Sequence, residues 1–391
     1  MTNVVDEWRA RRSDLEIEHA RAIEAIESTC EDVYASWVDV MTSVKRRPGR
    51  IHGDGDGDDD ENDYVDDDEW KTKTLKKARM KAQTELRALR RELIKHSKSH
   101  VERGRVREQC ARMATFSTTS AFALRKLPTL DARLEASDEA LDDEQFGKTL
   151  AMALEDDGED GRGRTRGRTF SLWACSRALD DGAAFARALR RETTGVKSRG
   201  EWTFAMDVHV AYVEGNYARF FALVASERCS YANACALERH FSRVRSRALR
   251  AMNVALGGGT PMSGEELARI LYMDDASEAL ALALACGLEV SERGVSFRVK
   301  AFEAPNFRDP DVEFALRTTT CSIVDRKLLP STSALAIIRG ENDSRSSLDD
   351  SRSLAPASRA DVDVAAARRA LDAARRALDA ARDAALDADA L

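Results

Sequence analysis

Residues 203–229 read TFAMDVHVAYVEGNYARFFALVASERC, residues 235–256 read CALERHFSRVRSRALRAMNVAL, and residues 258–302 read GGTPMSGEELARILYMDDASEALALALACGLEVSERGVSFRVKAF. These three stretches decide the fold because their patterns differ. The first predicts two amphipathic helices joined at a Gly-Asn corner, and the second predicts one long basic helix over 236–256. The third predicts two short helices and then a β-hairpin. Together they indicate a mainly α-helical chain.

The corner of the first stretch is set by two adjacent residues. Gly215 stands where a helix end favours a residue with positive φ, and Asn216 is a good cap for the helix that follows. Apolar residues recur at helical spacing on both sides of the corner: Phe204, Val208, Ala211 and Tyr212 before it, and Tyr217, Phe220, Phe221 and Val224 after it. The two helices are therefore expected to fold against each other.

The third stretch has the signals of a winged helix. Ser263 with Glu266 and Asp275 with Glu278 fit two capping boxes, each placed before an apolar run, and Gly287 ends the second helix. Two β-rich runs then flank Ser-Glu-Arg-Gly, which is typical of a hairpin wing. The long basic helix before them completes a three-helix module.

Four short sequence strings resemble those of a known family, and their order and spacing along the chain also agree with that family. They are Gly215-Asn216-Tyr217-Ala-Arg219-Phe220-Phe221-Ala-Leu223, Arg243-Val-Arg245-Ser-Arg247-Ala248-Leu249-Arg250-Ala251-Met252, Pro261-Met262-Ser263, and Cys286-Gly287-Leu288-Glu289-Val290. This pattern resembles the suppressor-of-actin/GANP family of messenger-RNA export scaffolds. The resemblance implies a stack of helical hairpins of the TPR/PCI-like kind that ends in a winged helix with a small β-hairpin.

Several basic residues are candidate contacts to nucleic acid. On the long helix the apolar side is Leu237, Phe241, Val244, Ala248, Met252 and Ala255. Arg239, Arg243 and Arg250 fall well away from that side, and Arg247 lies at its border. Together with two cations of the wing, Arg298 and Lys300, they form the candidate set. A solvated face is the alternative. Arg245 lies nearer the apolar side, which indicates an internal cation tied to a carboxylate or a helix end.

Composition limits the class of protein. The chain has 391 residues, a net charge of -7 and 43% hydrophobic residues, enough for one large or two modest domains with polar extensions. Overall acidity argues against a protein that coats nucleic acid uniformly, although local basic patches remain compatible with binding. The seven cysteines lack a CxxC pair, which favours reduced, buried thiols. No signal peptide or membrane span is predicted, so a nuclear or cytosolic protein is expected.

The chain is expected to fall into five segments. They are an N-terminal helical segment (1–50), an acidic disordered loop (51–69), the family's domain (70–330) with its winged helix at about 236–303, a disordered linker (331–361), and an Ala-rich C-terminal helix (362–391). Within the domain, a long basic helix over 70–113 and an arginine-glycine run at 162–168 are further candidates for RNA contact. A solvated helix face is the alternative for the first, and a charged surface loop that interrupts the helices is the alternative for the second. Residues 320–327 resemble the strand-like tail that closes the family's domain.

Motifs for catalysis and for metal binding are missing. The sequence contains no GxxxxGK[ST], GxSxG or HExxH. The acidic loop alternates aspartates as an EF-hand does, but Asp59 and Val65 stand where that motif needs glycine and glutamate. His96 and His100 have metal-ligand spacing without a further ligand nearby. We therefore expect a non-enzymatic protein without cofactor or metal.

The family resemblance also implies a function, which composition alone cannot indicate. It implies a scaffold of a nuclear, transcription-coupled messenger-RNA export complex of the TREX-two type. The expected partners are a PCI-domain protein, a small acidic Sem/Dss-type subunit and RNA. Docking at the nuclear pore is in doubt, because FG repeats are missing and no long helix for a centrin-type partner is evident. The alternatives are a subunit of a proteasome-lid or signalosome assembly, or a splicing- or centrosome-linked family member.

Overall fold

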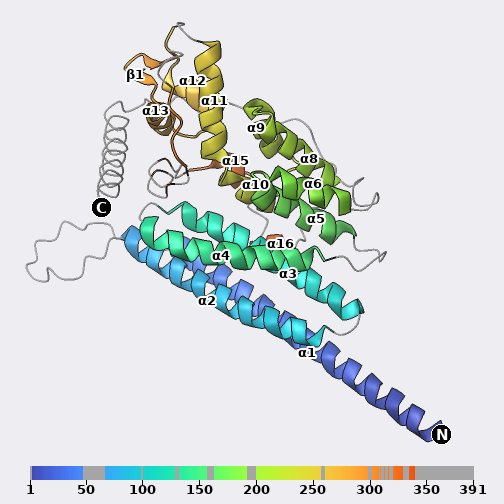
Figure 1. Cartoon of the computed structure of the whole chain (residues 1–391). Coiled ribbons are helices and arrows are strands. Elements are labelled where there is room, and N and C mark those ends of the chain that lie inside the picture. Colours follow the sequence, from blue (N-terminus) through green and yellow to red (C-terminus); the bar gives the residue numbers. More distant parts are fainter. Residues whose placement is uncertain are drawn as a thin grey trace, which may run out of the picture. The chain divides into compact units, whose positions relative to one another are not determined.

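The computed structural model describes residues 2–46, 67–97, 100–127, 132–155, 163–191, 200–256, 260–297, 302–307, 309, 312, 316, 320–328 and 334–339. The chain divides into two compact units. The first comprises Met1–Leu130, Ala140–Trp173 and Pro330–Asn342, and the second comprises Asp131–Glu139, Ala174–Leu329 and Asp343–Leu391. Helices dominate both units, and the described β structure is one two-stranded sheet with a single isolated bridge (Figure 1). The mainly α prediction is confirmed.

The first unit is built on long helices. Its elements are α1 (Thr2–Arg46), α2 (Asp67–His96), α3 (His100–Arg125), the second half of α4 (Ala132–Ala153), α5 (Gly163–Trp173) and α16 (Ala334–Arg339). Helices α1 and α2 pack as an antiparallel hairpin, with His19 facing His96 at 3.0 Å between ring nitrogens (Figure 1). The apolar stripe of α1 supplies Tyr34 and Trp37, whose rings lie 5.6 and 5.9 Å from Phe116 of α3. Burial of these rings holds the unit together.

The first unit departs from the sequence prediction in four places. The basic helix expected over 70–113 is two helices, because Ser97 bonds back to the Ile94 carbonyl through both its amide and its hydroxyl. Helix α2 starts at Asp67, inside the expected acidic loop. The Arg-Gly run is helical from Gly163, where α5 begins. Residues 334–339, expected in a disordered linker, form α16, because Ile338 is buried in the core of this unit.

The second unit is a series of shorter helices. Its elements are η1 (Ala174–Ala178), α6 (Gly182–Arg191), α8 (Gly200–Val213), α9 (Tyr217–Ala225), α10 (Tyr231–Glu238), α11 (Phe241–Ala255), α12 (Gly264–Leu271), α13 (Ala276–Ala285), β1 (Glu289–Ser291), β2 (Gly294–Ser296) and α15 (Ser322–Asp325). We call residues 241–297 the terminal module. It contains α11, α12 and α13 and then the hairpin of β1 and β2, which is the order of elements expected for a winged helix.

The Gly-Asn corner forms as the sequence predicts. Gly215 has φ of 68°, and the amides of Gly215 and Asn216 bond to the carbonyls of Tyr212 and Ala211, which closes the end of α8. The Asn216 side chain then accepts a hydrogen bond from the Arg219 amide at 3.0 Å and caps α9. Local chemistry therefore fixes this turn.

Stacked aromatic rings join α9 to the terminal module. Phe221 lies 5.4 Å from Phe220, 5.2 Å from Phe241 of α11, and 5.3 Å from Tyr272 at the end of α12. The three phenylalanines are fully buried. Edge-to-face and stacked pairs at these separations add to the hydrophobic stabilisation of each ring. Within the string 215–223, Phe220 and Phe221 therefore belong to the core.

The terminal module has capped helices and a tight wing. Ser263 accepts a hydrogen bond from the Glu266 amide, as its capping prediction requires, whereas Asp275 caps α13 through the Ser277 amide rather than the predicted Glu278 amide. In the hairpin, Val290 pairs with Val295, and Met262 also bridges Val295 through two backbone hydrogen bonds of 2.9 and 2.8 Å. The wing is thereby fastened to the turn before α12.

Two predicted elements of the second unit are wrong in detail. The long helix over 236–256 is interrupted at Arg239 and His240, since α10 ends at Glu238 and α11 begins at Phe241. The buried His240 side chain faces Asp180 and the Tyr212 ring there, so tertiary contacts favour the break. The strand-like tail is instead helix α15, fixed by the buried Val324.

Candidate nucleic-acid interface

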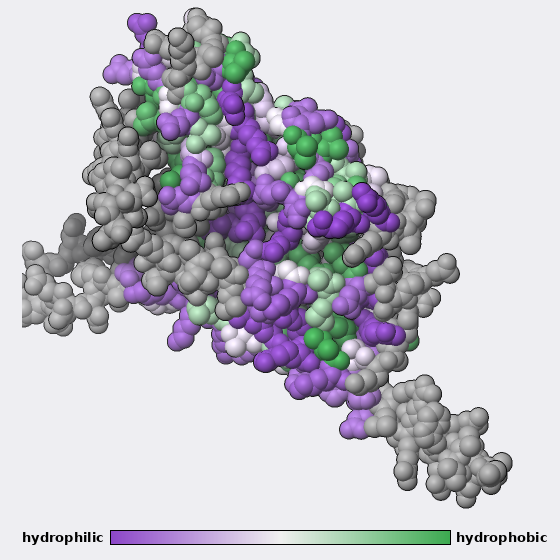
Figure 2. Space-filling model, in the orientation of Figure 1, coloured by the Kyte–Doolittle hydropathy of each residue, from purple (hydrophilic) through white to green (hydrophobic). Residues whose placement is uncertain are grey.

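Helix α11 carries a basic stripe on its outward side. Arg243, Arg247 and Arg250 fall within about 60° of one another around the helix, since successive residues turn by about 100°. The opposite side is buried and includes Val244, Ala248 and Met252. Hydrophilic residues follow α11 in the view of Figure 2. We call Arg243, Arg247 and Arg250 the α11 stripe; it runs for about 10 Å along the helix.

The three arginines of the stripe differ in their partners. Arg250 is exposed and makes no ion pair or hydrogen bond within the described part of the chain. Arg247 is exposed too, and its guanidinium lies 4.6 Å from the centre of the Tyr212 ring while Nη1 donates to the Tyr212 carbonyl at 3.2 Å. A cation held against an aromatic face keeps its charge available to solvent.

Arg243 forms an ion pair with the carboxylate of Asp180, a partner that the sequence did not predict. Its Nη1 lies 2.5 Å from Oδ2 of Asp180, and its side chain remains 34% exposed. Oδ1 of the same carboxylate accepts a hydrogen bond from the Tyr212 hydroxyl at 2.5 Å. Burial disfavours the Asp180 charge, but the Tyr212 hydroxyl and the nearby cations outweigh it and lower the pKa of Asp180. Asp180 is thus an anion beside a cationic stripe.

Arg245 has the internal role that its position indicates. It is only 2% exposed, and its Nε and Nη2 donate to the carbonyls of Leu271 and Tyr272 at 3.0 and 2.7 Å. These carbonyls end α12, where they lack partners within the helix. The guanidinium also lies 5.2 Å from the Phe241 ring and 5.6 Å from the Phe221 ring. Of the two roles open from the sequence, the helix end is the one observed.

The other residues predicted from the sequence lie away from the α11 stripe or outside the described residues. Arg239 is exposed at the C-cap of α10. Arg298 and Lys300 lie outside the described residues, so the contribution of the wing stays a prediction. Arg219 pairs with Asp207 at 3.0 Å, on the exposed side of the α8–α9 corner. Gly287, with φ of 74°, ends α13 and places Leu288 in the core.

Among the described residues, the side chains of His209 and of the cysteines lie in partly or fully buried, structural settings. The His209 ring stacks on Phe185 at 3.8 Å, and burial lowers its pKa. All seven cysteines are buried and unbonded to one another. Burial raises the pKa of Cys30, Cys110 and Cys229 to about 12, so these thiols are neutral at physiological pH.

The residues that the structure describes contain neither a metal site nor a membrane span. No three or more His, Cys, Asp or Glu side chains gather there closely enough to hold a metal ion. Among the described helices, none has the length and apolar character needed to traverse a bilayer.

Comparison with known proteins places the chain in a family. The sequence model of the SAC3/GANP family matches residues 82–292, more than half of the chain. That range contains the Gly-Asn corner, the α11 stripe and strand β1, and it ends just before β2 of the terminal module. SAC3 family protein 1 of Schizosaccharomyces pombe is 32% identical over 134 residues, which are 34% of this chain and 13% of that protein. The chain thus belongs to the SAC3/GANP family.

Proposed function

We propose that this chain is a non-catalytic scaffold of a nuclear, transcription-coupled messenger-RNA export complex of the TREX-two type, and that its α11 stripe contacts RNA. Family membership supports an export-type scaffold. The observation that carries the RNA contact is the stripe itself, three arginines on the outward side of one helix of the terminal module. In this proposal the module acts as a winged helix, and phosphate contacts give affinity without sequence preference.

The end of α11 favours a protein partner beside the RNA. Val254 and the C-cap residue Leu256 are 68% and 42% exposed, and they lie four and six positions after Arg250. Apolar side chains left exposed next to a basic stripe are typical of a surface that another protein covers. The proposed partners are a PCI-domain protein and a small acidic Sem/Dss-type subunit. The acidic subunit would complement the arginines.

Affinity purification of the full chain, followed by identification of the co-purifying chains, tests the proposed complex. Recovery of a PCI-domain protein together with a small acidic subunit is expected. Recovery of proteasome-lid or signalosome subunits instead would reject the export assignment. Recovery of splicing or centrosome proteins would place the chain in another branch of the family.

Replacing Arg247 and Arg250 with glutamine should weaken RNA binding and flatten its salt dependence. Each phosphate contact to a single strand contributes a slope of about -0.7 in log K against log salt, so the slope should become shallower by about 1.4. Titration of a fluorescent single-stranded RNA at several salt concentrations measures this. Arg228→Gln is the control, because Arg228 pairs with Asp207 away from α11. An unchanged slope in the double variant would reject the stripe as the RNA contact.

Asp180→Asn should strengthen RNA binding. The substitution removes the negative charge that neutralises Arg243, so one more arginine becomes available to phosphate. The expected change is an affinity gain of about threefold at low salt and a salt slope steeper by about 0.7. Asp207→Asn is the matched control, since Asp207 pairs with Arg219 and Arg228, neither of which lies on α11. Weaker binding by Asp180→Asn would show that Asp180 positions Arg243 rather than competing for it.

A further inference from the structure

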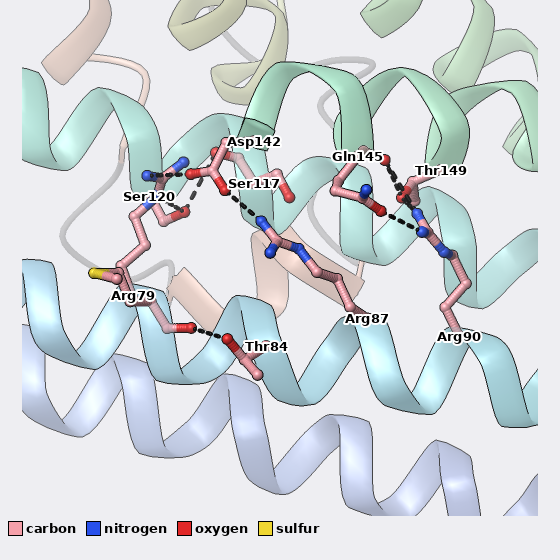
Figure 3. A network of polar contacts seen from close by, with 10 residues as sticks. Arg79, Thr84, Arg87, Arg90, Ser117, Ser120, Asp142, Gln145 and Thr149 are labelled. Carbon is pink, nitrogen blue, oxygen red and sulfur yellow. Dashed lines mark hydrogen bonds and ion pairs between the residues drawn. The ribbon is translucent and has the colours of Figure 1, made fainter. Parts of the chain in front are cut away.

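A network of polar side chains connects α2 to α4 in the first unit (Figure 3). Arg79 and Arg87 of α2 both bind the Asp142 carboxylate of α4, at 2.9 and 2.6 Å. The carboxylate is largely buried, with 16% of its side chain exposed. Two guanidinium groups therefore share one negative charge at this place.

Arg90 adds a third cation, and its bonds are all to neutral groups. Its Nη1 donates to the Gln145 carbonyl at 3.0 Å and also to the Thr149 hydroxyl, and its Nη2 donates to Oε1 of Gln145 at 2.7 Å (Figure 3). Only 8% of the residue is exposed. No described carboxylate forms an ion pair with it. A buried charge without a counter-charge is unfavourable, so this arrangement is unusual.

The electrostatics of Arg90 agree with its geometry. Burial lowers the pKa of Arg90, and the positive charges of Arg87 and Arg91 act in the same direction. The one neighbour that would favour its charge is Cys110. Burial raises the pKa of that thiol to about 12, so Cys110 is neutral at physiological pH and supplies no compensation. The positive charge of Arg90 is therefore unbalanced.

Other arginines of the same unit show the usual arrangement. Arg105 pairs with Glu27 at 2.6 Å. Arg112 pairs with both Glu31 and Glu108 at 3.0 Å. These two arginines are more exposed than Arg90, with 24% of each side chain accessible, and yet they have carboxylate partners. The more deeply buried cation is the one that lacks an anion.

Arg87 and Arg90 line a pocket between α2, α3 and α4. The pocket has a volume of about 30 Å³, and its polar lining also includes Gln83, Ser117, Asp142, Gln145 and Thr149. The Gln83 amide and the Ser117 hydroxyl are of the kind that donates hydrogen bonds to an oxyanion, whereas the Thr149 hydroxyl already donates to the Gln145 carbonyl at 2.8 Å. Arg87 keeps 29% of its side chain exposed and so marks the open side. A space of this size suits the oxygens of one small group, and anything attached to that group would extend past Arg87.

We infer that this pocket binds a small oxyanion, and specifically a phosphate group. The unbalanced charge of Arg90 supplies the attraction, and the second guanidinium at the open side matches the several oxygens of a phosphate. Asp142 does not oppose binding decisively, because Arg79 and Arg87 already share its charge. The inference does not rest on the proposed RNA contact of α11, since it uses side chains of the first unit alone.

Titration calorimetry on the full chain at constant ionic strength tests the site. Inorganic phosphate is expected to bind saturably at one site. Arg90→Gln should weaken binding by at least about tenfold, since a hydrogen bond to a charged group is worth that much in affinity. Arg112→Gln is the matched control and should bind phosphate as the unchanged chain does. The same titration with phenyl phosphate forms the second arm. If phenyl phosphate binds as tightly as inorganic phosphate, the natural ligand is an esterified phosphate. If phenyl phosphate does not bind, the natural ligand is free phosphate.

A second variant keeps the test decisive if Arg90→Gln folds poorly. Arg87→Gln alters the more exposed side of the pocket and should also weaken phosphate binding. Circular dichroism establishes folding for each variant. Failure of the unchanged chain to bind either phosphate compound would overturn the inference. Equal binding by the unchanged chain, Arg90→Gln and Arg87→Gln would overturn it too, because the anion would then lie elsewhere.

Discussion

Gly294→Ala is expected to unfold the wing of the terminal module. Gly294 has φ of 115°, where residues other than glycine are strained. An added Cβ would overlap the Met262 carbonyl oxygen and lie 2.6 Å from the carbonyl carbon. Backbone atoms cannot move aside as a flexible side chain can, so the two hydrogen bonds between Met262 and Val295 must break. The combined cost is about 4 kcal/mol, from strain, overlap and lost hydrogen bonds.

Amide hydrogen exchange gives the clearest measurement of this effect, because it reports the wing separately from the rest of the chain. Protection at the amides of Met262 and Val295 should fall by about 1000-fold, which corresponds to the expected free energy. Gly200→Ala is the control. Gly200 begins α8 and an added Cβ there meets nothing within 4 Å, so that variant should be as stable as the parent or slightly more stable. Preserved protection in Gly294→Ala would disprove the close approach at Met262.

Arg245→Met is expected to be the second most damaging substitution, with a loss of about 3 kcal/mol in the free energy of unfolding. Methionine fills similar space but donates no hydrogen bond, so the Leu271 and Tyr272 carbonyls at the end of α12 lose their partner. Each unsatisfied buried carbonyl costs about 1–3 kcal/mol. The contacts of the cation with the Phe241 and Phe221 rings are lost as well. Relief of the cost of burying a charge offsets part of this loss.

Urea denaturation of the two variants Arg245→Met and Arg250→Met separates this effect from helix propensity. Both substitutions lie on α11, but Arg250 is exposed and should change stability by less than about 0.5 kcal/mol. Arg245→Lys keeps the charge without the fork that reaches both carbonyls, so its stability should fall between that of Arg245→Met and that of the parent. Equal stability of Arg245→Met and the parent would contradict the structural role of this guanidinium.

The parts of the fold that the sequence predicted depend on local chemistry. Gly215 and Asn216 end one helix and cap the next through groups only a few residues away. Ser263 and Asp275 act within one turn of their own helices. The outward direction of the α11 stripe also follows from periodicity alone. Such features need no knowledge of the tertiary structure, which explains why they were found.

The parts that the sequence missed depend on residues distant along the chain. The break before α11 occurs where His240 and Arg243 meet Asp180, about sixty positions earlier. Nothing near Asp180 in the sequence marks it as the neighbour of the stripe. Arg90 did leave a signal, because it falls within the apolar stripe of α2 next to Leu86 and Leu93. A charge at such a position indicates a buried polar site, although its partners on α4 cannot be read from α2.

Helix α16 has a consequence for how this protein can be divided. It follows the terminal module in sequence, but Ile338 completes the core of the first unit and Arg339 binds Glu31 at 2.7 Å. The family match ends at residue 292, well before this helix. Recombinant fragments that stop at that boundary would leave an apolar surface of α1 and α3 uncovered and tend to aggregate. Scission of the backbone within the second unit, by contrast, would leave all pieces of the first unit present and able to stay associated without a covalent link.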